Sequence, residues 1–178
     1  MESNYLQSAL RLFKYYKSLG DKAIERIAED KIHFQFNEDS NSLALMVRHI
    51  AGNMLSRWTD FLTTDGEKPW RNRDSEFDDP NWNKEELVAQ WEKGWAALFN
   101  ATEPLNADDL EKIVYIRNEG HTVMEAINRQ IAHYAYHVGQ IVFLAKAITS
   151  EWETLSIARN KSSDFNKNKV TTQVNKYL

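Results

Sequence analysis

The chain has 178 residues and a formal net charge of −4, and 42% of its residues are hydrophobic. This length and composition suit one compact domain, which we expect over residues 1–166, with residues 167–178 as a frayed C-terminal tail. The sequence contains no cysteine, which excludes disulfides, thiolate metal sites and cysteine nucleophiles. Any metal ligand must therefore come from His, Asp or Glu.

The N-terminal residues mix polar and apolar side chains and lack the continuous apolar segment of a secretory signal. No apolar run approaches the roughly 20 residues that cross a bilayer. A mildly acidic chain also lacks the basic field that nucleic-acid phosphates require. We therefore expect a cytoplasmic protein that binds neither a membrane nor a nucleic acid.

Four long segments repeat apolar residues at spacings of three and four, which predicts helices over residues 4–30, 42–63, 83–102 and 122–149. The three prolines lie outside these segments. Asn83 is followed by Glu86, and Thr122 by Glu125, so two of the helices begin with a predicted capping box. The pattern predicts an all-α protein built as a four-helix bundle.

The connections are long. Residues 64–82 form a predicted ordered crossover loop, in which the mixed charges of residues 71–74 indicate a solvated surface. In the second crossover, Ile113–Ile116 alternates in a way that favours a strand or hairpin arm. After residue 150 the helical period is lost, and we expect the tail to dock on the bundle end through Trp152, Leu155, Ile157 and Phe165.

The histidines are the most informative feature of the sequence. His133 and His137 are four residues apart, which puts both rings on one helical face beside an apolar stripe. His49 lies on another predicted helix, among core-type residues. Three His ligands with one open position are typical of a metal site that performs chemistry.

Other interpretations stay open at this point. An i, i+4 His pair also arises by chance, and a His beside an apolar stripe is often a hydrogen-bonded, half-buried residue. His33 and His121 are expected in loops or at the surface, outside the site. Trp58, Trp91 and Trp95 are interpreted as core residues.

Several polar residues lie near the expected ligands. Asn53, Gln130 and Tyr134 are each predicted to orient an imidazole or a bound water, and Tyr136 is a further hydroxyl candidate. We find no Asp or Glu on the expected metal face that must serve as a general base. That feature slightly favours thiol activation over hydrolysis by a metal-bound hydroxide.

Two segments carry a resemblance to a known family. They are residues 45–53, around His49, and residues 133–141, which read HYxxHxGQI. With these segments and its order of helices and crossovers, nearly the whole chain resembles the DinB/YfiT-like metalloenzymes, with a tail like that of an uncharacterised subgroup. The resemblance implies an up-down-down-up four-helix bundle in which His49, His133 and His137 hold a divalent metal. Nickel or zinc would be the usual ion, and iron and manganese are also compatible.

The same resemblance implies the function. Some members are thiol-dependent transferases that use a low-molecular-weight thiol, and homodimers are common. We therefore expect a metal-dependent transferase or hydrolase acting on a small molecule that the sequence does not identify. The alternative is a non-catalytic, metal-binding stress-response protein. A third reading is a plain helical interaction domain whose histidines bind nothing.

Overall fold

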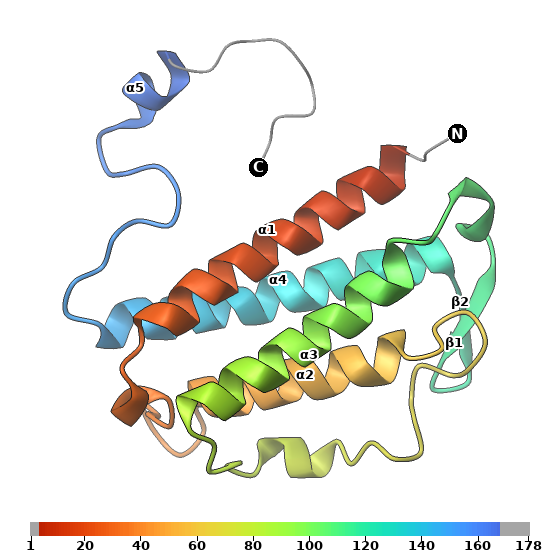
Figure 1. The fold of residues 1–178 in the computed structure, drawn as a ribbon, viewed down its shortest axis with the longest axis horizontal. Helices are drawn as coiled ribbons and strands as arrows, with labels where there is room; N and C mark the ends of the chain where they lie inside the picture. The colour runs from red at the N-terminus through yellow and green to blue at the C-terminus, as the bar shows by residue number, and fades with distance from the viewer. Residues whose placement is uncertain (1–3, 168–178) are drawn as a thin grey trace.

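The structure is a computed structural model that describes residues 4–167, which are mostly helical (Figure 1). In this range, three short 3-10 helices and one two-stranded sheet lie between or beside the α-helices. The α-helices are α1 (Asn4–Arg26), α2 (Leu43–Trp58), α3 (Lys84–Thr102), α4 (Val123–Ile148) and α5 (Ser162–Lys167). The 3-10 helices are η1 (Glu29–Lys31), η2 (Asp74–Phe77) and η3 (Ala107–Asp109), and the strands are β1 (Ile113–Ile116) and β2 (Glu119–Thr122).

The helix starts follow from the capping residues. The side chains of Asn83 and Thr122 accept hydrogen bonds from the backbone N–H groups of Glu86 and Glu125. The carboxylate of each glutamate in turn accepts a bond from the backbone N–H of the capping residue. Both predicted capping boxes are therefore confirmed. Each box satisfies backbone donors that the first helical turn leaves unpaired.

Helix α2 ends at Trp58, five residues before the predicted end at residue 63. Asp60 adopts a left-handed backbone conformation with φ of 49°, and its carbonyl accepts the N–H groups of Thr63 and Thr64. Phe61 folds back onto Trp58, with ring centroids 4.7 Å apart. Phe61 is buried although it lies in a turn after the helix. Its apolar side chain therefore extended the helical pattern in the sequence beyond the real end of α2. Helix α1 also ends early, at Arg26, and gives way to η1.

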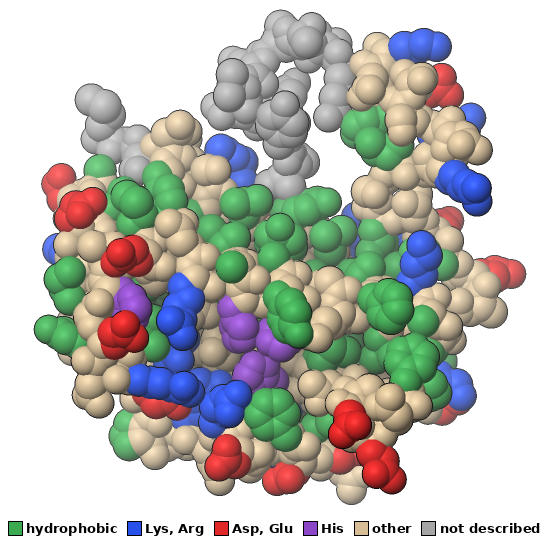
Figure 2. All heavy atoms as spheres, turned by 180° about the vertical axis from the view of Figure 1, so that it is seen from behind, with side chains coloured by type: hydrophobic (Ala, Val, Ile, Leu, Met, Phe, Trp, Pro, Cys, Tyr) green, Lys and Arg blue, Asp and Glu red, His purple; other side chains and the backbone are tan. Residues whose placement is uncertain are grey.

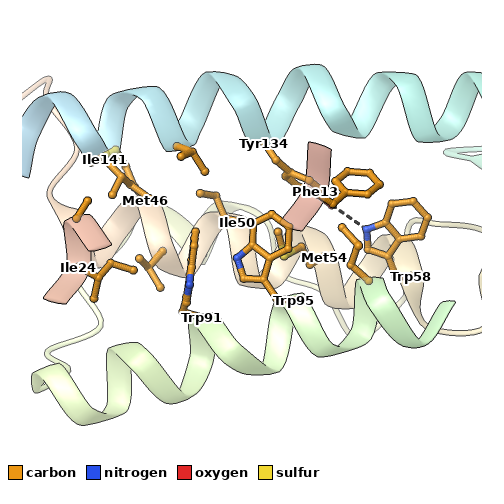
Figure 3. Close-up of a cluster of buried hydrophobic side chains, with 14 of the residues drawn as sticks. Phe13, Ile24, Met46, Ile50, Met54, Trp58, Trp91, Trp95, Tyr134 and Ile141 are labelled. Carbon is orange, nitrogen blue, oxygen red and sulfur yellow. Dashed lines mark hydrogen bonds between the residues drawn. The ribbon is translucent and has the colours of Figure 1, made fainter. Parts of the chain in front are cut away.

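Aromatic side chains from all four long helices meet in the core (Figure 3). Trp58, Trp91 and Trp95 are at most 2% exposed, which confirms them as core residues. Phe13 of α1 packs edge-on against Trp58, and Trp95 of α3 packs against Tyr134 of α4. Helix α1 contacts α4, α2 contacts α3, and α2 also contacts α4. The α2–α4 contact brings together the two helices that carry the site histidines.

The second crossover contains a β-hairpin. Strand β1 pairs antiparallel with β2, and Ile116 lies opposite Glu119. Arg117 and Asn118 have φ of 56° and 63°, which is the backbone of a two-residue hairpin turn. The predicted strand over Ile113–Ile116 is confirmed.

The start of the tail contacts the long helices. Trp152 packs against the core and lies under the guanidinium of Arg26, 5.1 Å from the ring centroid. Ile157 and Phe165 are 39% and 43% exposed, so the docking of the tail beyond Trp152 stays a prediction. The sequence pattern also missed α5, which Figure 1 draws apart from the long helices. The expected frayed segment falls, beyond Lys167, outside the described residues.

None of the helices in residues 4–167 is long and apolar enough to cross a membrane. The cytoplasmic location and the single-domain boundary at residue 166 stay predictions.

Candidate metal centre

Three histidines from two helices converge. The Nε2 atoms of His133 and His137 on α4 are 3.1 Å apart, and the Nε2 atom of His49 on α2 is 3.4 Å from that of His133. One nitrogen from each ring lies within 4.8 Å of the other two. The clustering of these residues, expected from the sequence, is therefore present in the structure.

This spacing fits a metal ion. A divalent ion binds imidazole nitrogens at about 2.0–2.1 Å, and tetrahedral ligands at that distance are about 3.4 Å from one another. The observed 3.1 and 3.4 Å between Nε2 atoms match that value with little movement. The three rings are thus arranged around a common point that each addresses with the same nitrogen.

The opposite nitrogens of two rings are tied to acceptors. His49 Nδ1 lies 2.9 Å from Oε2 of Glu76, and His137 Nδ1 lies 2.8 Å from Oε1 of Gln140. The amide of Gln140 in turn donates to the hydroxyl of Tyr136. Because these oxygens only accept, Nδ1 of both rings must carry a proton. In its neutral form, each of these rings then presents the Nε2 lone pair to the centre, as a metal ligand must.

The environment of His133 strongly disfavours its protonated form. Burial, with the neighbouring His137 and His49 adding to it, lowers the pKa of His133 to about 3. Its Nδ1 atom is buried and has no hydrogen-bond partner among the described residues. Burial also lowers the pKa of His137. Both rings of α4 are thus held neutral at physiological pH.

Glu76 and Arg71 form a buried pair behind His49. Their side chains are 6% and 3% exposed, and Arg71 donates to both Glu76 carboxylate oxygens, at 2.7 and 2.9 Å. Burial alone would raise the pKa of Glu76, but the hydrogen bonds from His49 and Arg71 outweigh it and hold that pKa below its usual value. The expectation that residues 71–74 form a solvated surface is wrong for Arg71, because its charge is compensated inside the protein.

The close approach of η2 to α2 depends on Gly52. A Cβ atom added at Gly52 would lie 2.5 Å from Oε1 of Glu76. Gly52 is three residues after His49, on the same side of α2. A side chain here would therefore displace the carboxylate that holds His49.

Salt bridges extend from this pair toward the hairpin. Glu67 lies 3.8 Å from Arg71, 3.4 Å from the buried Arg57 and 3.1 Å from Arg117. The carboxylate of Asp65 accepts the backbone N–H groups of Arg117 and Asn118 in the hairpin turn. The first crossover is thus fixed between the histidines and β1–β2.

Asn53 and Tyr134, which were predicted to orient the ligands, bond to other groups instead. The hydroxyl of Tyr134 accepts a bond from Trp58 Nε1 in the core (Figure 3). The same hydroxyl donates a bond to Oδ1 of the buried Asn53. Gln130 is 3% exposed, and its Oε1 has no partner among residues 4–167. None of these three hydrogen-bonds to a site imidazole, and Glu76 and Gln140 do so instead.

Two further histidines stay outside the cluster, as expected. His33 lies 2.8 Å from Asp79, and its other ring nitrogen bonds to the carbonyl of Trp82. His121 is in β2, with Glu119 at 3.8 Å. Neither is part of the group of convergent nitrogens.

The fold and the site together define a mostly helical protein with a candidate three-histidine metal centre. Comparison with protein families is more specific. Residues 1–161 match the family described as "Protein of unknown function (DUF1572)", and the chain belongs to that family. No curated protein matches the chain.

Proposed function

We propose that His49, His133 and His137 bind one divalent metal ion and that the protein is a metal-dependent enzyme. The observation that carries the proposal is the convergence of three Nε2 atoms at 3.1 and 3.4 Å. A divalent ion at this point would lower the pKa of a bound water or thiol and so supply a nucleophile near neutral pH. The protein's own part is to keep the two rings of α4 neutral by burial and to orient His49 and His137 through Glu76 and Gln140.

We also propose that the four long helices form a DinB-like bundle with up-down-down-up topology. The contacts of α1 with α4 and of α2 with α3 support this arrangement. The position of the histidines, one on α2 and two on α4, agrees with the ligand set that the resemblance implies. Nickel or zinc is the proposed ion, because neutral imidazoles suit these borderline metals.

Within this proposal, thiol transfer is preferred to hydrolysis. Hydrolysis by a metal-bound hydroxide would gain from a carboxylate that is free to act as a base. Glu76 is the carboxylate beside the site, but both of its oxygens accept bonds from Arg71 and one also accepts from His49. Its low pKa further suits an orienting anion. A low-molecular-weight thiol would therefore be the nucleophile.

The alternative is a non-catalytic protein that keeps the metal for structure or stress response. A structural site is closed by four protein ligands, whereas a catalytic site leaves a position open. In the part of the chain that the structure describes, the cluster holds three such residues and no fourth His, Asp or Glu. This count favours the enzyme.

Cobalt substitution tests the proposed chemistry. The protein is loaded with Co²⁺ and titrated with a small thiol such as 2-mercaptoethanol while its visible and near-ultraviolet absorption is recorded. Thiol activation predicts a new thiolate-to-cobalt charge-transfer band, which His49→Ala should abolish. Unchanged spectra with thiol present would contradict the transferase branch, and retained stoichiometric Co²⁺ in His49→Ala would contradict the three-ligand site.

We further propose a homodimer. Phe143, on α4, is 69% exposed. Exposed apolar side chains of this size are typical of interfaces. Gel filtration of the full chain should give a dimer mass that Phe143→Glu converts to a monomer, and a monomer mass for the wild type would contradict the proposal.

A further inference from the structure

We infer that the substrate of the metal centre is a small organic anion with an apolar body, held by arginines around the histidines. This inference deepens the proposed function and depends on it for the chemistry at the metal. Its basis is the surface next to the three rings, which combines exposed aromatic side chains with guanidinium groups.

Two exposed aromatic side chains flank the site. Phe77 in η2 is 43% exposed, and its ring stacks on His49 with centroids 5.5 Å apart. Tyr136 is 63% exposed, and its ring meets the edge of His137 at 4.9 Å. Exposed rings in direct contact with candidate ligands offer an apolar surface to a bound molecule. Phe77 thus lies beside His49, and Tyr136 lies beside His137.

Three arginines near the site have no carboxylate partner in residues 4–167. The guanidinium of Arg73 lies over Phe77, 5.3 Å from the ring centroid, and Arg48 donates only to the backbone carbonyl of Asp78. Arg129 is exposed on α4, one turn before His133 and on the same helical face. Asp74, next to Arg73 in the chain, forms no ion pair with it in the structure. Figure 2 shows Lys and Arg side chains beside the central histidines, with hydrophobic side chains on their other side.

This distribution differs from that of the buried arginines. Arg57 and Arg71 have Glu67 and Glu76 as partners, so their charge is compensated within the protein. These arginines have no carboxylate partner in residues 4–167, although the chain has more acidic than basic residues and a net charge of −4. Since neutral imidazoles do not offset the charge of a divalent ion, the metal would add to this positive field. A carboxylate or phosphate on the substrate would meet that field, because guanidinium binds both groups well.

Matched probes test the inference. We would titrate zinc-loaded protein with 2-naphthoate and with its neutral isostere 2-naphthamide by calorimetry. The same titrations would be run on metal-free protein. The test variant is Arg73→Gln/Arg129→Gln, in which both changes are at exposed positions, and Arg159→Gln in the tail is the control for losing an exposed arginine away from the site. Circular dichroism and zinc content would be measured for each protein.

The inference predicts that naphthoate binds about tenfold more tightly than naphthamide, and that the double variant loses most of this preference while Arg159→Gln keeps it. Equal binding of the two probes would overturn the inference. A preference that survives in the double variant would also overturn it, since the carboxylate would then bind the metal alone. If the protein holds no zinc but the metal-free form keeps an arginine-dependent preference, the anion site stands and the proposed metal function fails.

Discussion

Glu76 accepts a hydrogen bond from Nδ1 of His49 at 2.9 Å, although the two residues are 27 positions apart and lie on different elements. Arg71 holds the same carboxylate from the other side. A carboxylate behind a metal-binding imidazole fixes the ring and raises its basicity. The crossover between α2 and α3 is therefore part of the site.

Glu76→Gln should weaken zinc binding by about 10- to 100-fold, because a neutral amide orients His49 less firmly. The affinity can be measured by competition with a chromophoric chelator. Glu111→Gln, which changes an exposed glutamate away from the site, should bind zinc like the wild type. Equal affinities for Glu76→Gln and the wild type would contradict the orienting role.

A pair of glycine substitutions tests the contact between η2 and α2. Gly52→Ala adds a Cβ atom that would lie 2.5 Å from Glu76 Oε1, so we expect weaker zinc binding and little of the usual gain in helix stability. Gly139→Ala on α4 adds a Cβ atom that meets nothing within 4 Å. It should stabilise the protein by about 0.5–1 kcal/mol without changing zinc affinity. Denaturant unfolding and chelator competition measure both effects, and tight zinc binding by Gly52→Ala would speak against the contact.

Tyr134→Phe should cost stability but spare the site. The change leaves Trp58 Nε1 and Asn53 Oδ1 without their buried partner, which costs about 1–3 kcal/mol in unfolding free energy. Zinc affinity should stay within about twofold, because Tyr134 bonds to no site imidazole. A large loss of zinc affinity in a folded variant would instead assign Tyr134 the orienting role predicted from the sequence.

The metal-free protein should lose stability as the pH falls from 7 to 5. His133 has a pKa of about 3 when folded and about 6.5 when unfolded, so unfolding takes up a proton in this range. The unfolding free energy therefore declines as the pH falls. At pH 5, His133 takes up about one proton each time the protein unfolds. Burial of His137 acts with the same sign. His133→Asn should give a shallower decline in chelator-treated samples, and an equal slope would show that His133 is not buried in its neutral form.

The sequence predicted the parts of the site that depend on helical period. The spacing of His133 and His137 and the capping box at Thr122 defined α4, and the apolar neighbours of His49 placed that residue near the core. The helical spacing of apolar residues carries no information about how a loop folds back onto a helix. The Arg71–Glu76 pair was therefore missed, and the charge of Arg71 was interpreted as solvated.

A different limit applies to the polar residues near the ligands. Asn53 and Tyr134 were predicted beside the imidazoles because their spacing allows it. Instead they bond to each other across α2 and α4, with Trp58 as the third partner. A hydroxyl and an amide that satisfy each other need no ligand, and only the packing of the helices decides between the two outcomes.

Elemental analysis by mass spectrometry tests the central claim most directly. Untagged full-length protein, purified without chelator and then incubated with zinc or nickel, is compared with His133→Ala/His137→Ala, whose fold is checked by circular dichroism. We predict about one metal ion per chain in the wild type and none in the variant. Equal metal content in the two proteins, or a wild type that stays empty after incubation, would contradict the three-histidine centre.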